Sequence, residues 1–176
     1  MAFRHVLVPT DFSEPANLAL PYAAEEAVMH RARVTLVHVL PSDAGTDVYY
    51  VSGAPAQGFE AGYDVVAGGR LGTAPVSEPT VVRRDDGEAA LTRLRDLVPE
   101  AFRGIWNVEV AVGRPADAIV RLARELEADL IVMATHGRTG LEHVVLGSVA
   151  ERVVRLAPCP VLTVKHARVP LVQRSE

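Results

Sequence analysis

The sequence predicts an α/β fold: an open five-stranded parallel sheet with helices on both faces. Short apolar runs alternate with segments of helical spacing along most of the chain, and Gly or Pro residues separate many of them. Strands that alternate with helices in this way are joined by right-handed crossovers into a parallel sheet. The apolar runs are nearly continuous, which indicates strands that are covered on both faces.

The first unit is a strand followed by a helix. Residues 5–9 (HVLVP) are a short β-branched run that predicts the strand, and helical spacing extends from there to His30. Ser13 is the predicted N-cap, because its hydroxyl can accept a hydrogen bond from an otherwise unpaired N–H. Pro21 lies inside the helical pattern, where it predicts a kink or a lost hydrogen bond.

Residues 33–40 (RVTLVHVL) predict the second strand, after which the periodicity disappears over residues 41–85. Structureless connections longer than about 12–15 residues are uncommon inside a compact domain. This segment is therefore interpreted as a long insertion that is a lid, an interaction loop for a protein partner, or a disordered segment without a site. Its tyrosines at positions 49, 50 and 63 could contact such a partner.

The alternation resumes after the insertion. Pro115 suits the first turn of a helix, and Pro160 suits the first position of a strand. The remaining predicted elements are a helix at 87–101, a strand at 107–113, a helix at 115–127, a strand at 128–135, a helix at 147–157 and a strand at 160–165.

Composition limits the classes of function. The 176 residues, 49% of them hydrophobic, are enough for a single domain over 1–176. A net charge of -4 without a Lys/Arg block argues against nucleic acid and membrane partners. The single cysteine, Cys159, cannot form an internal disulfide and has no metal-binding spacing, so we predict a packed side chain and a cytoplasmic protein with no metal site of its own.

Three polar or Gly-rich segments follow predicted strands: PTD at 9–11, HVL at 38–40 and ATHG at 134–137. In open parallel sheets, ligands bind beyond the carboxyl ends of the strands, where the strand order reverses. These three segments can converge there only if their strands are neighbours in the sheet.

The segment from 134 to 149 has features of a phosphate site. Gly137 and Gly147 can expose backbone N–H groups, and the helix that follows adds a partial positive charge. Arg138 either neutralises a phosphate or lies in solvent. Ser148 and Glu151 also have the S-x-x-E spacing of a capping box, so Ser148 can cap the helix, bind phosphate, or do both.

Several segments together resemble the universal stress protein family: VPTDFSEPA, LVHV, DLIVMATHGRTG, VLGSVAERVV and PCPVLTVK. The resemblance covers residues 3–40 and about 86–166. It implies the strand order 3-2-1-4-5, a homodimer formed through the last strand and, in many members, a site for ATP with a divalent cation such as Mg²⁺ on its phosphates.

The ATP-binding members have a glycine, two residues, a glycine, nine residues and then Gly-Ser or Gly-Thr. This chain matches at Gly137, Gly147 and Ser148, but has Ala134 at the first position. We expect Ala134 to be tolerated if its φ is negative. The resemblance implies a binding site made of Pro9, Thr10, Asp11, Val39, Met133, Ala134, His136, Gly137, Arg138, Gly147, Ser148 and Val149.

The leading hypothesis is an ATP-binding regulatory protein of the stress response, whose nucleotide state modulates its conformation or its partners. The alternative is a dimeric interaction protein that binds no nucleotide and uses the insertion. Slow ATP hydrolysis is a weaker hypothesis, because the chain has no GxxxxGK[ST] motif and His136 has no nucleophile or carboxylate at a spacing that requires it. No catalytic residue is assigned.

Overall fold

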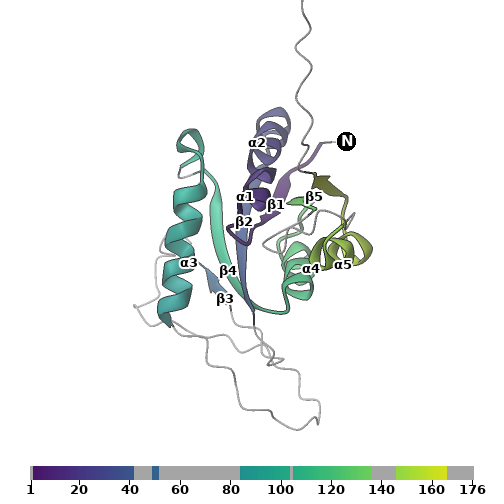
Figure 1. The fold of residues 1–176 in the computed structure, drawn as a ribbon. Coiled ribbons are helices and arrows are strands. Elements are labelled where there is room, and N and C mark those ends of the chain that lie inside the picture. Colours follow the sequence, from purple (N-terminus) through teal and green to yellow (C-terminus); the bar gives the residue numbers. More distant parts are fainter. Residues whose placement is uncertain (1, 42–48, 52–83, 104, 136–145, 166–176) are drawn as a thin grey trace, which may run out of the picture.

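A twisted sheet of mainly parallel strands forms the centre of the protein (Figure 1). The computed structural model describes residues 2–41, 49–51, 84–103, 105–135 and 146–165. The parallel strands are β1 (His5–Pro9), β2 (Arg33–Pro41), β4 (Asn107–Gly113), β5 (Leu130–Ala134) and β6 (Val161–Val164). Their order in the sheet is β4-β2-β1-β5-β6, which confirms the predicted order 3-2-1-4-5.

One further strand was not predicted. Within the insertion, β3 (Tyr49–Val51) pairs antiparallel with β4, with Tyr50 opposite Val110. It extends the sheet at the edge opposite β6, so the prediction of a segment without regular structure is wrong at these three residues. The remainder of the insertion, residues 42–48 and 52–83, lies outside the described residues.

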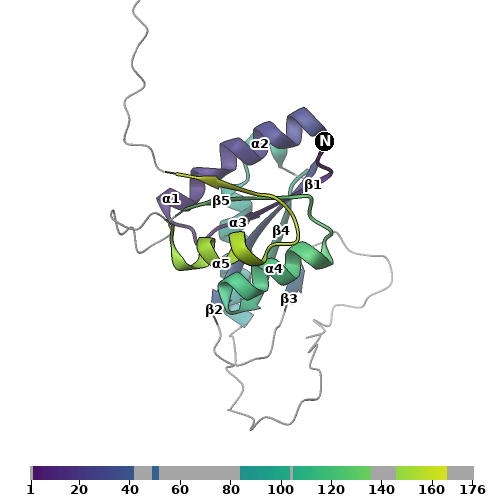
Figure 2. The same cartoon turned by 90° about the vertical axis from the view of Figure 1, so that its right-hand side faces the viewer.

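The helices cover both faces of the sheet (Figure 2). Along β1, Val6 and Val8 join the core cluster with α2 and α3, whereas Leu7 joins the cluster with α4 and α5. This alternation explains the continuous apolar strands, since each fully buried aliphatic side chain contributes about 1.5–3 kcal/mol on either face. The helices are α1 (Glu14–Asn17), α2 (Ala19–His30), α3 (Arg84–Leu97), α4 (Pro115–Glu125) and α5 (Ser148–Leu156).

The predicted first helix is divided in two at Leu18, three residues before Pro21. Proline lacks the N–H that would bond to the carbonyl four residues earlier, and its ring crowds that carbonyl, which here belongs to Asn17. Pro21 therefore lies in the first turn of α2, where no intrahelical N–H bond is required. The interruption was predicted, but at the proline itself.

The helix predicted at 87–101 begins earlier and ends earlier. It starts at Arg84 and stops at Leu97, because Pro99 disfavours the helical conformation of the residue before it. A separate 3₁₀ turn, Glu100–Phe102, follows. None of the helices in the described ranges has the length and apolar run that a membrane span requires.

Candidate functional site

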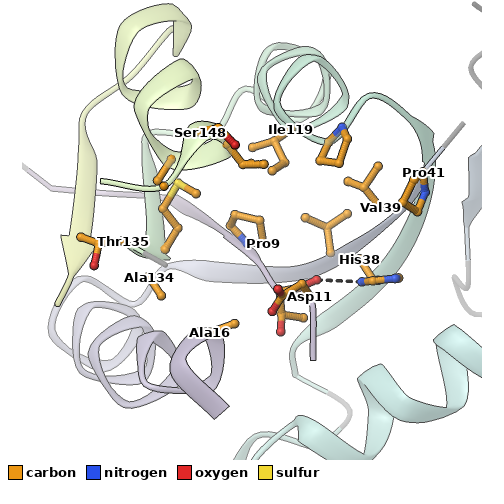
Figure 3. A pocket seen from close by; sticks show the side chains of 17 residues that line it. Pro9, Asp11, Ala16, His38, Val39, Pro41, Ile119, Ala134, Thr135 and Ser148 are labelled. Carbon is orange, nitrogen blue, oxygen red and sulfur yellow. Dashed lines mark hydrogen bonds between the residues drawn. The ribbon is translucent and has the colours of Figure 1, made fainter. Parts of the chain in front are cut away.

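A cavity of about 340 Å³ lies at the carboxyl ends of the central strands (Figure 3). β1 lies between β2 and β5 and pairs in parallel with both, so the carboxyl ends of these three strands lie side by side. The cavity is at the point where the strand order reverses, as the sequence predicted.

Nine of the twelve predicted site residues line this one cavity. They come from the end of β1, the end of β2, the end of β5 and the start of α5: Pro9, Thr10, Asp11, Val39, Met133, Ala134, Gly147, Ser148 and Val149. The other three, His136, Gly137 and Arg138, lie outside the described residues.

The loop after β1 is held by its own polar side chains. The Thr10 N–H donates to the Val37 carbonyl at 2.8 Å, and the Thr10 hydroxyl accepts from the Phe12 N–H at 3.0 Å. Asp11 Oδ1 accepts from the Ser13 N–H at 3.0 Å. These bonds fix the direction in which the chain leaves the sheet, which places Thr10 and Asp11 at the wall of the cavity.

Ser13 begins α1 as predicted. Its hydroxyl oxygen accepts from the Ala16 N–H at 3.3 Å, and its backbone is extended, with φ -77° and ψ 155°. Ala16, one turn into the helix, lines the cavity. The hydrogen bond from the Ala16 N–H to the Ser13 hydroxyl therefore connects the loop after β1 to the part of the cavity wall that α1 forms.

The backbone N–H groups that are available at the start of α5 differ from the predicted ones. Gly147 is the N-cap, and its N–H donates to the Thr135 carbonyl at 2.7 Å, so this N–H is already used within the protein. The donors at the start of the helix are those of Ser148, Val149 and Ala150, which have no carbonyl one turn before them within the helix. All three residues line the cavity, at the positive end of the helix dipole.

The predicted capping box is absent from the start of α5. Ser148 is the first residue of the helix, and no side chain caps it by a hydrogen bond. The spacing to Glu151 fits the motif, but the cap position is occupied by Gly147, one residue earlier. The Glu151 carboxylate instead lies 3.9 Å from the Arg155 guanidinium on the exposed face of α5. Capping by its side chain is therefore not the role of Ser148 in this structure, and ligand contact stays a prediction.

Ala134 ends β5 as an ordinary strand residue. It pairs with Val164 of β6, and it is not among the described non-glycine residues that have positive φ. Its methyl group therefore requires no strained backbone, as expected from the sequence. Ala134 lies at the cavity wall beside Thr135 (Figure 3).

Sequence reasoning missed several lining residues. Pro115 and Ile119 belong to the first turns of α4, which begins where β4 ends and so faces the same end of the sheet. Their spacing of four residues on an apolar helix was a usable signal. His38 was indicated only as part of the segment 38–40 and not as a site residue; it lines the cavity near the end of β2 and donates from Nδ1 to the Thr10 carbonyl at 2.8 Å.

Cys159 is partly buried against the core cluster on the α4 and α5 face. Burial, with a smaller effect from the negative charge of Asp129, raises the pKa of the Cys159 thiol. This confirms the packed thiol predicted from sequence. Within the described ranges, no three His, Cys, Asp or Glu side chains gather closely enough to hold a metal ion.

Comparison with known proteins agrees with this architecture. The model of the universal stress protein family matches residues 2–165. The universal stress protein MJ0531 of Methanocaldococcus jannaschii is 34% identical over 170 residues, which cover 94% of this chain and 84% of that protein.

Two solved structures share the fold. Hypothetical protein MJ0577, from the same organism, aligns with a TM-score of 0.63 at 23% identity, over 95% of this chain and 99% of its own. A universal stress protein in complex with cAMP aligns with a TM-score of 0.59 at 23% identity, over 95% and 100% of the two chains. With nearly its whole length matched by the family model, the chain belongs to the universal stress protein family.

Proposed function

We propose that this protein binds ATP, together with a divalent cation, in the cavity at the carboxyl ends of β1, β2 and β5, and that it acts as a regulatory protein of the stress response. Its nucleotide state modulates its conformation or its partners. The observation that carries the proposal is that one cavity combines the N-terminal turn of a nine-residue helix with an apolar wall.

The phosphates are assigned to the start of α5. Three successive backbone N–H groups, of Ser148, Val149 and Ala150, border the cavity, and such groups favour an anion at a helix N-terminus. The Ser148 hydroxyl adds a donor. Gly147 carries no side chain there, so a phosphate can approach the backbone closely.

The base is assigned to the apolar wall. Val39 and Pro41 lie at the end of β2, Ile119 lies on α4, and Met133 is contributed by β5. Figure 3 places Val39 and Pro41 on the side of the cavity away from Ala134 and Thr135. A planar heterocycle gains free energy by leaving water for such a surface.

Asp11 is assigned to the ribose or to the cation. Its carboxylate belongs to the loop after β1 and lines the cavity wall. Carboxylates are preferred ligands of Mg²⁺, which usually binds through one or two of them together with phosphate oxygens and water. The cAMP complex of the related solved structure is consistent with a nucleotide in this fold.

Calorimetry of the purified chain with ATP and Mg²⁺ tests the proposal. Replacing Ser148 by Ala removes one hydrogen bond to a charged group, and we expect affinity to fall about tenfold or more. Gly147→Val should abolish binding, because its φ of -67° and ψ of 155° accept a branched residue while the added side chain fills the cavity. Thr92→Ala, on the exposed face of α3, is the control. A parent protein that gives no heat and retains no nucleotide would contradict the proposal.

A further inference from the structure

We propose that Arg93 and Phe12 are positioning residues, which hold the loop at residues 10–13 in the conformation that presents Asp11 to the cavity. This inference rests on the proposed nucleotide site for its functional consequence. Its structural part, the contact between α3 and the loop, is independent of any ligand.

Phe12 has a backbone conformation that its residue type disfavours. Its φ is 64°, in the left-handed region, where a non-glycine residue is uncommon and a bulky one is an outlier. Residues held in this region persist only where the surrounding structure fixes them, and they concentrate at functional sites. Phe12 lies between Asp11 and Ser13, whose N–H donates to Asp11 Oδ1, so the backbone turn at Phe12 is part of the geometry that holds the Asp11 carboxylate.

Two side chains from other elements contact the Phe12 ring. The centroid of the His38 ring, on β2, lies 4.2 Å from that of Phe12, with the ring planes inclined by 35°. The guanidinium carbon of Arg93, on α3, lies over the Phe12 ring at 4.0 Å from its centroid, within the range of a cation–π interaction. The phenyl ring is thus in contact with both a sheet strand and a helix.

The same group of residues is tied to the cavity by hydrogen bonds. His38 donates from Nδ1 to the carbonyl of Thr10, and the hydroxyl of Thr10 accepts from the N–H of Phe12. Figure 3 shows His38 next to Asp11, at the edge of the cavity. A change in the Phe12 ring position would therefore act on two cavity residues, Thr10 and Asp11.

Arg93 reaches this loop from the side of the sheet opposite α5. α3 packs with α2 on one face, whereas α4 and α5 pack on the other. Arg93 itself is exposed, so its guanidinium can be replaced without opening the core. The contact gives α3 an influence on a cavity that, among the described residues, is lined by other elements.

Arg93→Gln tests the inference in the full-length chain, with Arg103→Gln as the control, because Arg103 is also an exposed arginine. Without ligand, the amide NMR signals of Asp11 and Ser13 and the ring signals of Phe12 should move in Arg93→Gln and stay unchanged in the control. With ATP and Mg²⁺, the dissociation constant of Arg93→Gln should rise about two- to fivefold, the range that corresponds to an exposed cation–π contact. In a Phe12→Leu background, Arg93→Gln should have no further effect.

Three results would overturn the inference: signals in Arg93→Gln that match the control, signals that move while ATP affinity equals that of the parent, or an equal loss of affinity with and without Phe12. If the parent binds no ATP, the proposed function fails, and the ligand-free signals still decide whether Arg93 holds the loop: movement supports this contact, and its absence refutes it.

Discussion

The methyl group of Ala134 bears on whether the cavity can bind ATP. The family's ATP-binding pattern has glycine at this position, but here the residue ends β5 in regular pairing with Val164. Ala134 is not among the described non-glycine residues with positive φ, so this position does not require the conformational freedom of glycine.

We therefore predict that Ala134→Gly changes ATP affinity by less than about tenfold, or roughly 1.4 kcal/mol. Its free energy of unfolding should fall by about 0.5–1 kcal/mol, because glycine is less favourable in a strand. Calorimetry and urea unfolding measure the two effects. A hundredfold gain in affinity would mean that the methyl group blocks the nucleotide, and would favour a function without nucleotide.

His5 is a second residue whose environment has a measurable consequence. It is buried at the start of β1, where its Nδ1 donates to the Leu126 carbonyl at 3.0 Å and its Nε2 accepts from the Thr35 hydroxyl at 2.8 Å. Both bonds suit the neutral ring. Burial lowers the pKa of His5 below 6.5, and this effect is larger than the opposing one of the Leu126 carbonyl.

Because the pKa of His5 is lower in the folded chain than in the unfolded chain, the imidazole of the unfolded chain is protonated first as the pH falls. The contribution of the neutral ring to stability is complete above about pH 6.5 and is lost as the pH falls from there toward the lowered value. Urea unfolding between pH 7.5 and 5 should show this loss. His5→Gln keeps a donor and an acceptor but does not titrate, so equal pH dependence in parent and variant would refute the assignment.

At the scale of elements, the sequence predicted most of the strands and helices, and its errors have physical causes. The parallel strands are buried on both faces, so their apolar runs were readable without knowledge of their neighbours. β3 was missed because three residues at a sheet edge have too short a pattern to read. The division of the first helix was misplaced because Pro21 acts on the carbonyl of Asn17, one turn earlier.

The start of α5 could be read only in part. The S-x-x-E spacing indicated a helix start at about the correct place. The N-cap is Gly147 and not Ser148, and the Gly147 N–H donates to the Thr135 carbonyl. That bond joins residues on either side of the segment 136–145, and no local pattern predicts it. The spacing of Pro115 and Ile119 marks one face of α4, but only the packing of that helix on the sheet places Ile119 at the cavity.

β6 leads to a prediction about assembly. It is the edge strand next to β5, with Leu162 36% exposed, and the neighbouring α5 exposes Val154 and Leu156. Unpaired edge strands with apolar side chains favour pairing with a second copy. We propose a homodimer formed through β6, as expected from the sequence.

Light scattering of the parent protein should therefore give twice the chain mass of 18.9 kDa. Leu162→Glu should shift the protein toward the monomer by placing a charge at the interface. Val28→Glu, on the exposed face of α2, should leave the dimer intact. A parent protein that scatters as a monomer at working concentrations would rule out this interface.

For the whole molecule, the strand order determines where a ligand can bind. The chain starts in the middle of the sheet, builds β2 and β4 on one side, and then crosses to β5 and β6 on the other. The reversal leaves β1 with a neighbour on each side and brings the carboxyl ends of β1, β2 and β5 to one cavity. The sequence indicated each of these strand ends separately, and only the fold brings them together.

The central claim is that a nucleotide occupies this cavity with its phosphates at the N-terminus of α5. Titration of the isotopically labelled protein with ATP and Mg²⁺, followed by the backbone amide signals in NMR, tests both binding and location. We predict the largest changes at Ser148, Val149 and Ala150, smaller ones at Thr10 and Asp11, and none at the exposed Val28 and Met29 of α2. An unchanged spectrum at saturating ATP, or changes confined to residues away from the cavity, would contradict the claim.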